Sequence, residues 1–143
     1  MTTYDDSNIF AKILRGDIPS VKIFETDTVV AIMDVMPQSK GHCLVIPKAP
    51  SRNLLDAEDA TLREVIVETA RLARAAKAAF AADGVSVMQF NEAAGGQTVF
   101  HLHVHVIPRY EGVALQGHGS AGMADPAMLA EQADLIRRQL TAA

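Results

Sequence analysis

Three of the five histidines in this 143-residue chain stand at alternate positions, as His101, His103 and His105. In a strand, side chains two residues apart point to the same face of the sheet, so these imidazoles would line one side together. A helix would spread them around its axis, and the valines between them favour a strand. The residues that alternate with the histidines are apolar and would face a core: Leu102, Val104 and Val106.

Such a row of imidazoles has three interpretations. A solvent-facing polar strand would be served equally well by threonine, lysine or glutamate, and histidine is scarce in the rest of the chain. A zinc site would use neutral imidazole, a common zinc ligand, and three histidines alone can bind this metal. No aspartate or glutamate lies between Glu92 and Glu111 to add a carboxylate nearby. The third interpretation is acid, base or nucleophile chemistry.

Nucleophilic chemistry at phosphorus explains more of the surrounding sequence. Neutral imidazole attacks phosphorus at pH 7, and the resulting phosphoimidazole is readily hydrolysed. A central histidine between two others can have one ring nitrogen fixed by a hydrogen bond while the other presents its lone pair. Gly95 and Gly96 would let the backbone approach a phosphate, and Gln97 and Thr98 place an amide and a hydroxyl just before the histidines.

The first part of the chain is predicted to form a short helix and three strands. Residues 9–15 have helical spacing of apolar side chains, with Ser7 or Asn8 as the cap and Gly16 as the end. Two runs rich in β-forming residues follow at 21–25 and 28–34, and a third lies at 42–47.

A long helix is predicted from Thr61 to Ala82, beginning with a capping box of Thr61 and Glu64 and stopped by Gly84. A strand over 85–92 and a short loop lead to the histidine strand, its expected antiparallel neighbour. Asp125 and Pro126 start a last helix that ends near Leu140. This order indicates an α+β domain with a mostly antiparallel sheet. The expected apolar face of the long helix consists of Leu62, Val65, Ile66, Thr69, Leu72, Ala73, Ala76 and Phe80.

The composition sets limits on function. With 49% hydrophobic and 21% charged residues, the chain is ordinary for one globular domain. Its net charge of −4, without a lysine- or arginine-dense run, argues against a polymeric nucleic acid partner but allows small phosphorylated ligands. An acidic N-terminus and the lack of a long apolar run predict a cytoplasmic protein without membrane contact. The lone Cys43 is expected to be a core residue.

The stretch "GGQTVFHLHVHVIPR" resembles the signature of the histidine triad (HIT) family of nucleotide hydrolases and transferases, His-φ-His-φ-His-φ-φ with φ apolar. "PQSKGHCLVIPK", "FNEAAGGQTVFH" and the segment from residue 8 to 34 also resemble the family, so the similarity covers residues 8 to about 109. It implies one HIT domain over residues 1–143, with a C-terminal loop and helix at 110–143. It further implies a HIT-like fold, in which a mostly antiparallel five-stranded sheet carries a long, a short and a C-terminal helix.

The resemblance assigns catalytic roles. His103 matches the nucleophile, which attacks the α-phosphate to give a nucleotidyl-histidine that water cleaves. His101 and His105 match the residues that orient it and bind phosphoryl oxygens, and His42 matches a fourth histidine behind the triad. A histidine at position 105, where the transferase branch has glutamine, favours a hydrolase. Further residues match contacts to the phosphate and the bridging atom of the leaving group: Gln97 and Thr98.

The resemblance also implies a nucleotide pocket. Asp34 matches the carboxylate that holds the ribose hydroxyls, and Asn91 and Gly96 match the phosphate side. Ile32 stands where some relatives have an aromatic residue. No cofactor and no metal are implied, because the cysteines that bind zinc in some bacterial relatives are absent and Ala11 occupies one of their places. The apolar walls around the base correspond to Ile9, Phe10, Ile13, Ile32, Val35 and Leu44.

The expected substrate is a purine nucleotide conjugate, either a nucleoside phosphoramidate or a dinucleoside polyphosphate, and the expected assembly is a homodimer. Two alternatives stay open: a regulatory nucleotide-binding protein with negligible turnover, and a three-histidine metal protein. His118, in the glycine-rich tail beyond the match, is expected to be an exposed loop residue.

Overall fold

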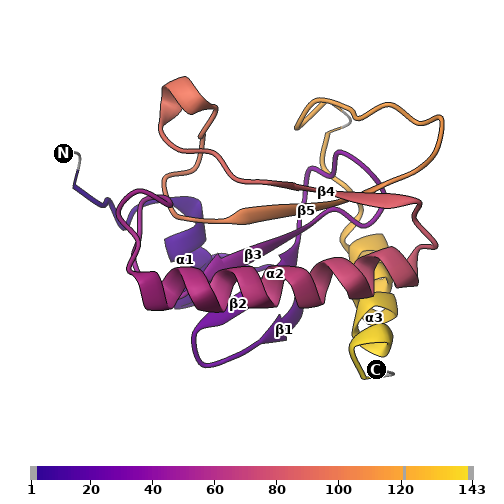
Figure 1. The fold of residues 1–143 in the computed structure, drawn as a ribbon, viewed down its shortest axis with the longest axis horizontal. Helices are drawn as coiled ribbons and strands as arrows, with labels where there is room; N and C mark the ends of the chain where they lie inside the picture. Colours follow the sequence, from indigo (N-terminus) through magenta and orange to yellow (C-terminus); the bar gives the residue numbers. More distant parts are fainter. Residues whose placement is uncertain (1–2, 121, 142–143) are drawn as a thin grey trace.

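The computed structural model describes residues 3–120 and 122–141, so residues 1–2, 121 and 142–143 of the expected domain lie outside the described residues. Figure 1 shows the helices and strands of this part of the chain. In chain order they are α1 (Ile9–Arg15), β1 (Lys22–Glu25), β2 (Val29–Met33), β3 (Cys43–Pro47), α2 (Asp59–Ala79), β4 (Gly84–Met88), the 3₁₀ turn η1 (Ala93–Gly95), β5 (Val104–Arg109) and α3 (Pro126–Thr141).

The five strands form one sheet in the order β1-β2-β3-β5-β4, and each strand is antiparallel to its neighbours. The predicted α+β class and the pairing of the histidine strand with the strand before it are therefore confirmed. In the register of the sheet, Leu44 of β3 lies opposite His105 of β5, and Met88 of β4 lies opposite the same histidine. In this order β1 and β4 are the two edge strands, and β5 lies between β3 and β4.

Alternation along the strands separates two apolar clusters. One face of the sheet packs against α2 and α3, with Met33, Cys43 and Val106 meeting Leu72 of α2 and Ile136 of α3. Figure 1 shows α2 lying along the sheet and α3 near the end of β1. The other face carries α1 and a smaller cluster of five buried side chains: Phe10, Val30, Ile32, Leu44 and Ile46.

The short helix was predicted correctly at both ends. The Asn8 side chain accepts a hydrogen bond from the Ala11 N–H, and Gly16 ends the helix in the left-handed conformation with φ of 83°. The interior of the histidine segment also agrees, because Leu102, Val104 and Val106 are buried.

The start of the long helix differs from the prediction. It begins at Asp59 with Glu58 at the N-cap, no side chain caps it, and Thr61 already lies inside it, so the capping box is not formed. The Leu62 N–H instead bonds to the Glu58 carbonyl, which fixes the first turn two residues early. The helix ends at Ala79 rather than Ala82. Ile66, placed on the apolar face by its spacing, is 60% exposed.

The strand boundaries around the histidines differ as well. β5 begins at Val104, so His101 and His103 precede it rather than lying within it. The Leu102 N–H donates to the Ser51 carbonyl, which ties this segment to a loop instead of a strand ladder. β4 ends at Met88, four residues earlier than expected, because Asn91 turns its side chain to the Leu54 N–H.

Gly41 determines the conformation of the turn that directly precedes His42. Its φ is +91°, and a Cβ there would lie 2.5 Å from two ring carbons of Phe80. The turn therefore needs glycine for both its backbone conformation and its close approach to the end of α2. Cys43, two residues on, is fully buried, as predicted. Within the described residues, no helix has the length and apolar character to cross a membrane.

Candidate active site

His101 is fixed by both ring nitrogens. Its Nε2 lies 2.8 Å from the Pro47 carbonyl oxygen and its Nδ1 lies 2.6 Å from the Tyr4 hydroxyl. Because a carbonyl can only accept, Nε2 carries the proton, and Nδ1 accepts from Tyr4. The side chain is 1% exposed. His101 is thus an anchor between the N-terminal segment and β3, and its ring has no nitrogen free for a phosphate.

His103 has the opposite character. Its Nδ1 lies 2.7 Å from the carbonyl oxygen of His101, so the ring proton sits on Nδ1 and Nε2 keeps its lone pair. The ring packs edge-on against Phe10 at 4.7 Å between centroids. Burial lowers the pKa of His103 to about 4. At neutral pH the residue is therefore an uncharged imidazole with a fixed tautomer, which is the form a nucleophile requires.

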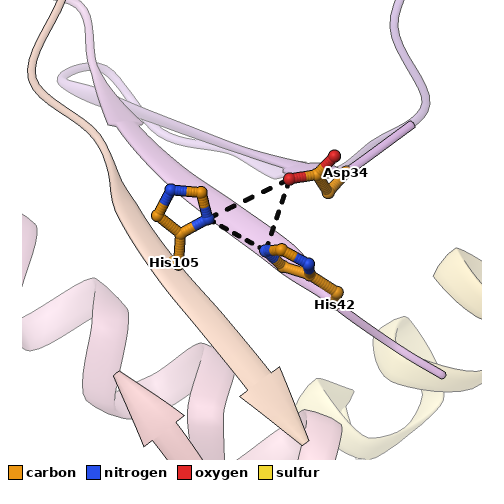
Figure 2. A group of neighbouring side chains, drawn as sticks. All are labelled: Asp34, His42 and His105. Carbon is orange, nitrogen blue, oxygen red and sulfur yellow. Dashed lines mark hydrogen bonds and ion pairs between the residues drawn. The ribbon is translucent and has the colours of Figure 1, made fainter. Parts of the chain in front are cut away.

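His42 and His105 form a directed chain of hydrogen bonds, which Figure 2 shows beside Asp34. The Gln38 backbone N–H donates to His42 Nδ1 at 3.0 Å, so the proton of a neutral His42 is on Nε2. His42 Nε2 lies 2.9 Å from His105 Nδ1, which must accept, leaving the Nε2 of His105 as an N–H donor. Burial lowers the pKa of both histidines to about 3.

Asp34 lies directly after β2, and its side chain is only 6% exposed. Its Oδ1 accepts from the Met36 N–H at 2.8 Å, and its Oδ2 lies 3.3 Å from His42 Nε2. His118 Nε2 lies 3.1 Å from Oδ2 and 3.4 Å from Oδ1. His118 is an exposed loop residue, as expected, but its half-exposed ring also contacts the buried carboxylate, which the sequence did not indicate.

Asp34, His42 and His105 each offer a ligand atom within 4.8 Å of the others, close enough to share a metal ion. A histidine that binds a metal normally donates its other ring N–H to an acceptor. The other nitrogen of His42, Nδ1, accepts from the Gln38 N–H instead. The hydrogen bonds around this cluster therefore fit a chain of neutral imidazoles better than a metal centre.

A second network holds the loop that leads to the triad. The Gln97 amide is buried and fully used: its nitrogen donates to the Arg52 and Val99 carbonyls, and its oxygen accepts from Asn53 and the Glu92 N–H. The Glu92 carboxylate in turn accepts two bonds from the Arg52 guanidinium. These contacts hold Glu92 at a positive φ of 65°. The Gln97 side chain therefore stabilises the loop and has no polar atom left to contact a ligand.

The remaining predicted site residues fall into four groups. Thr98 and Ile9 line a pocket of about 550 Å³ beside the N-terminal segment, which the histidines do not line. Asn91 fastens the loop through Gln89 and the Leu54 N–H, and Gly96 is exposed with φ of +100°. Val35 is 41% exposed, away from the smaller apolar cluster. The other predicted wall residues belong to that cluster or pack against it: Phe10, Ile13, Ile32 and Leu44.

Three contributors to the site were missed by the sequence analysis. Tyr4 lies in no recognisable motif. Gln38 acts through its backbone N–H, which every residue except proline has. His118 lies 84 residues from Asp34 in sequence, in a glycine-rich stretch beyond the family resemblance. Only the rarity of histidine in this chain could have drawn attention to His118.

The fold and the linked histidines define a histidine triad protein. The HIT domain family model matches residues 15–112, and the chain belongs to this family. The structure is similar to that of a Hit-like protein involved in cell-cycle regulation from Bartonella henselae, with unknown ligand. The TM-score is 0.89 at 53% identity, over 96% of this chain and 99% of that one.

Two curated relatives are similar in sequence. Protein hit of Bacillus subtilis is 40% identical over 71% of this chain and 70% of its own length. Adenosine 5'-monophosphoramidase HNT1 of Saccharomyces cerevisiae is 38% identical over 75% of this chain and 65% of its own length.

Proposed function

We propose that this protein is a nucleotide hydrolase that cleaves a purine nucleotide conjugate at its α-phosphate through a nucleotidyl-His103 intermediate. The hydrogen bond from His103 Nδ1 to the His101 carbonyl carries the proposal, because it leaves a neutral ring with its Nε2 lone pair available. The low pKa of about 4 keeps this form dominant across the physiological range. Similarity to a yeast phosphoramidase supports the class of substrate.

The reaction proceeds in two displacements. His103 Nε2 forms a bond to the α-phosphorus while the bond from phosphorus to the leaving nitrogen or oxygen breaks, and the leaving group takes a proton from solvent. Water then forms a new bond to phosphorus, the Nε2–phosphorus bond breaks, and a proton returns to solvent with release of the nucleoside monophosphate. The histidine is regenerated in its original tautomer.

The other residues have supporting roles in this proposal. The outward Nε2–H of His105 donates to a phosphoryl oxygen, with its direction fixed by His42. His101 positions His103 through its backbone. Gln97 and Asn91 hold the loop that precedes the histidines in place, and Asp34 faces the ribose. The apolar residues around Phe10 form the floor beneath the base.

The substrate is tested by comparing adenosine phosphoramidate with diadenosine tetraphosphate, using purified protein and chromatographic detection of AMP. We expect turnover of the phosphoramidate. Mass spectrometry of acid-free quenched samples should find AMP attached to the peptide that contains His103. Binding of AMP without turnover of either compound would contradict the hydrolase and favour a nucleotide-binding protein.

A further inference from the structure

We propose that His118 is a positioning residue for nucleotide recognition: it orients the Asp34 carboxylate toward the ribose and thereby sets the preference for ribonucleotides over 2′-deoxynucleotides. The inference rests on the proposed role of Asp34 in nucleotide binding. It does not require that the bound nucleotide is hydrolysed.

The Asp34 carboxylate is almost completely surrounded. Its two oxygens offer about four acceptor positions. The Met36 backbone N–H takes Oδ1, His42 approaches Oδ2, and His118 lies against both oxygens. The single Nε2 proton of His42 is directed to His105 Nδ1. The donors to the carboxylate are therefore Met36 and His118, and acceptor capacity remains for a ligand hydroxyl. The half-exposed ring of His118 lies between the carboxylate and solvent. The position of this ring therefore determines the orientation in which the carboxylate can accept a hydrogen bond from a ligand.

Two hydrogen bonds, one on each side of His118 in sequence, hold this residue against Asp34. The Gln38 side-chain nitrogen donates to the Gln116 carbonyl at 2.7 Å, and the Ala124 N–H donates to the Val35 carbonyl at 2.9 Å. Both anchors belong to the segment 34–38 that begins with Asp34. The loop from residue 110 to 125 is therefore fastened to the same turn that carries the carboxylate, and His118 lies between the two anchors.

The charges around Asp34 give His118 a specific role. Burial raises the pKa of Asp34, while hydrogen bonding from Met36 and the charge and hydrogen bond of His118 oppose the rise. The other titratable groups that face the carboxylate are His42 and His105, whose pKa values of about 3 keep them neutral. His118 is the described side chain that supports the ionised carboxylate. A protonated Asp34 would lose acceptor capacity for the ribose hydroxyls.

The test measures binding of AMP and 2′-deoxy-AMP by calorimetry to the full chain, to His118→Ala and to His118→Gln. We expect the native protein to bind AMP more tightly. His118→Ala should lower the AMP affinity about tenfold or more, as loss of a hydrogen bond to a charged group does, and leave 2′-deoxy-AMP binding nearly unchanged. His118→Gln keeps an N–H donor and should retain most of the discrimination. Met123→Ala, at an exposed position of the same loop, is the matched control.

Several results would overturn the inference. If His118→Ala binds AMP as tightly as or more tightly than the native protein, the contact is dispensable or inhibitory. If both affinities fall equally, His118 only supports the loop. A native protein that does not distinguish the two nucleotides would also refute it. Turnover separates this inference from the proposed function: AMP binding with His118-dependent discrimination but no phosphoramidate hydrolysis would reject the hydrolase and support His118.

Discussion

The Nδ1 of His103 donates to the backbone carbonyl of His101, two residues earlier, at 2.7 Å. The first histidine of the triad thus orients the second through its main chain, while its own ring turns away to Pro47 and Tyr4. The third, His105, is oriented by a different route, from Gln38 through His42. The three alternate histidines therefore have three different sets of hydrogen-bond partners despite their equal spacing.

Replacing His103 by alanine should abolish turnover and preserve AMP binding, because the rest of the pocket is untouched. Loss of the covalent route is expected to reduce kcat/KM more than about a hundredfold. Rapid-quench kinetics and calorimetry check the two parts separately. Residual activity above about a hundredth of the native value would mean that another group attacks the phosphorus.

Tyr4→Phe should destabilise the protein by about 1–3 kcal/mol, because it leaves the buried Nδ1 of His101 without its donor. Urea unfolding measures the free energy. Tyr110→Phe is the matched control, since its hydroxyl bonds to the Lys40 carbonyl at an exposed position and should cost less. An equal decrease in the free energy of unfolding in both variants would show that the Tyr4–His101 hydrogen bond stabilises the protein no more than an exposed one.

Local patterns predicted those features that depend on neighbours in sequence. The alternation of residues 101–106 placed Leu102, Val104 and Val106 in the core because side-chain direction follows the backbone directly. It could not show that Ser51 would take the Leu102 N–H and delay the start of β5. The contact between His118 and Asp34 also depends on the course of a long loop, which no periodic pattern describes.

Stability should fall as the solution is acidified below about pH 6.5. His42, His103 and His105 have folded pKa values of about 3, 4 and 3, lowered by burial from 6.5. Between these values and 6.5 the unfolded chain binds protons that the folded chain excludes, so acid favours unfolding, by up to about 1.4 kcal/mol per pH unit for each histidine.

Urea unfolding at pH 7 and pH 5.5 measures this slope. His103→Asn removes one of the three groups and should make the slope shallower. A native protein whose stability is unchanged or higher at pH 5.5 would contradict the neutral, buried state of these histidines.

Prolonged dialysis against EDTA should leave phosphoramidate turnover unchanged. The Nδ1 of His42 accepts a backbone hydrogen bond, which is unfavourable for a metal ligand at its Nε2. Elemental analysis should find less than one zinc per chain. Stoichiometric zinc that is lost in an Asp34→Asn variant would instead support the three-residue metal cluster.

We also propose a homodimer, with mass near twice 15.3 kDa in sedimentation at micromolar concentration. β4 is an edge strand whose Val87 is 49% exposed, and α2 exposes Ile66 and Val67. Pairing across a two-fold axis would cover such an edge and these apolar side chains. Val67→Glu should shift the protein toward monomer, whereas Gln139→Glu, at an exposed position of α3, should not. A native protein that is a stable monomer would refute the assembly.

The burial of Cys43 makes this protein convenient for site-specific labelling. Its thiol is enclosed by the core, and burial raises its pKa, so it should not react with maleimides while the chain is folded. A cysteine introduced at the exposed Ala114 or Gly117 would then be the single reactive thiol. A fluorophore attached there could follow the 110–125 loop in real time as nucleotide is added, in an otherwise native background.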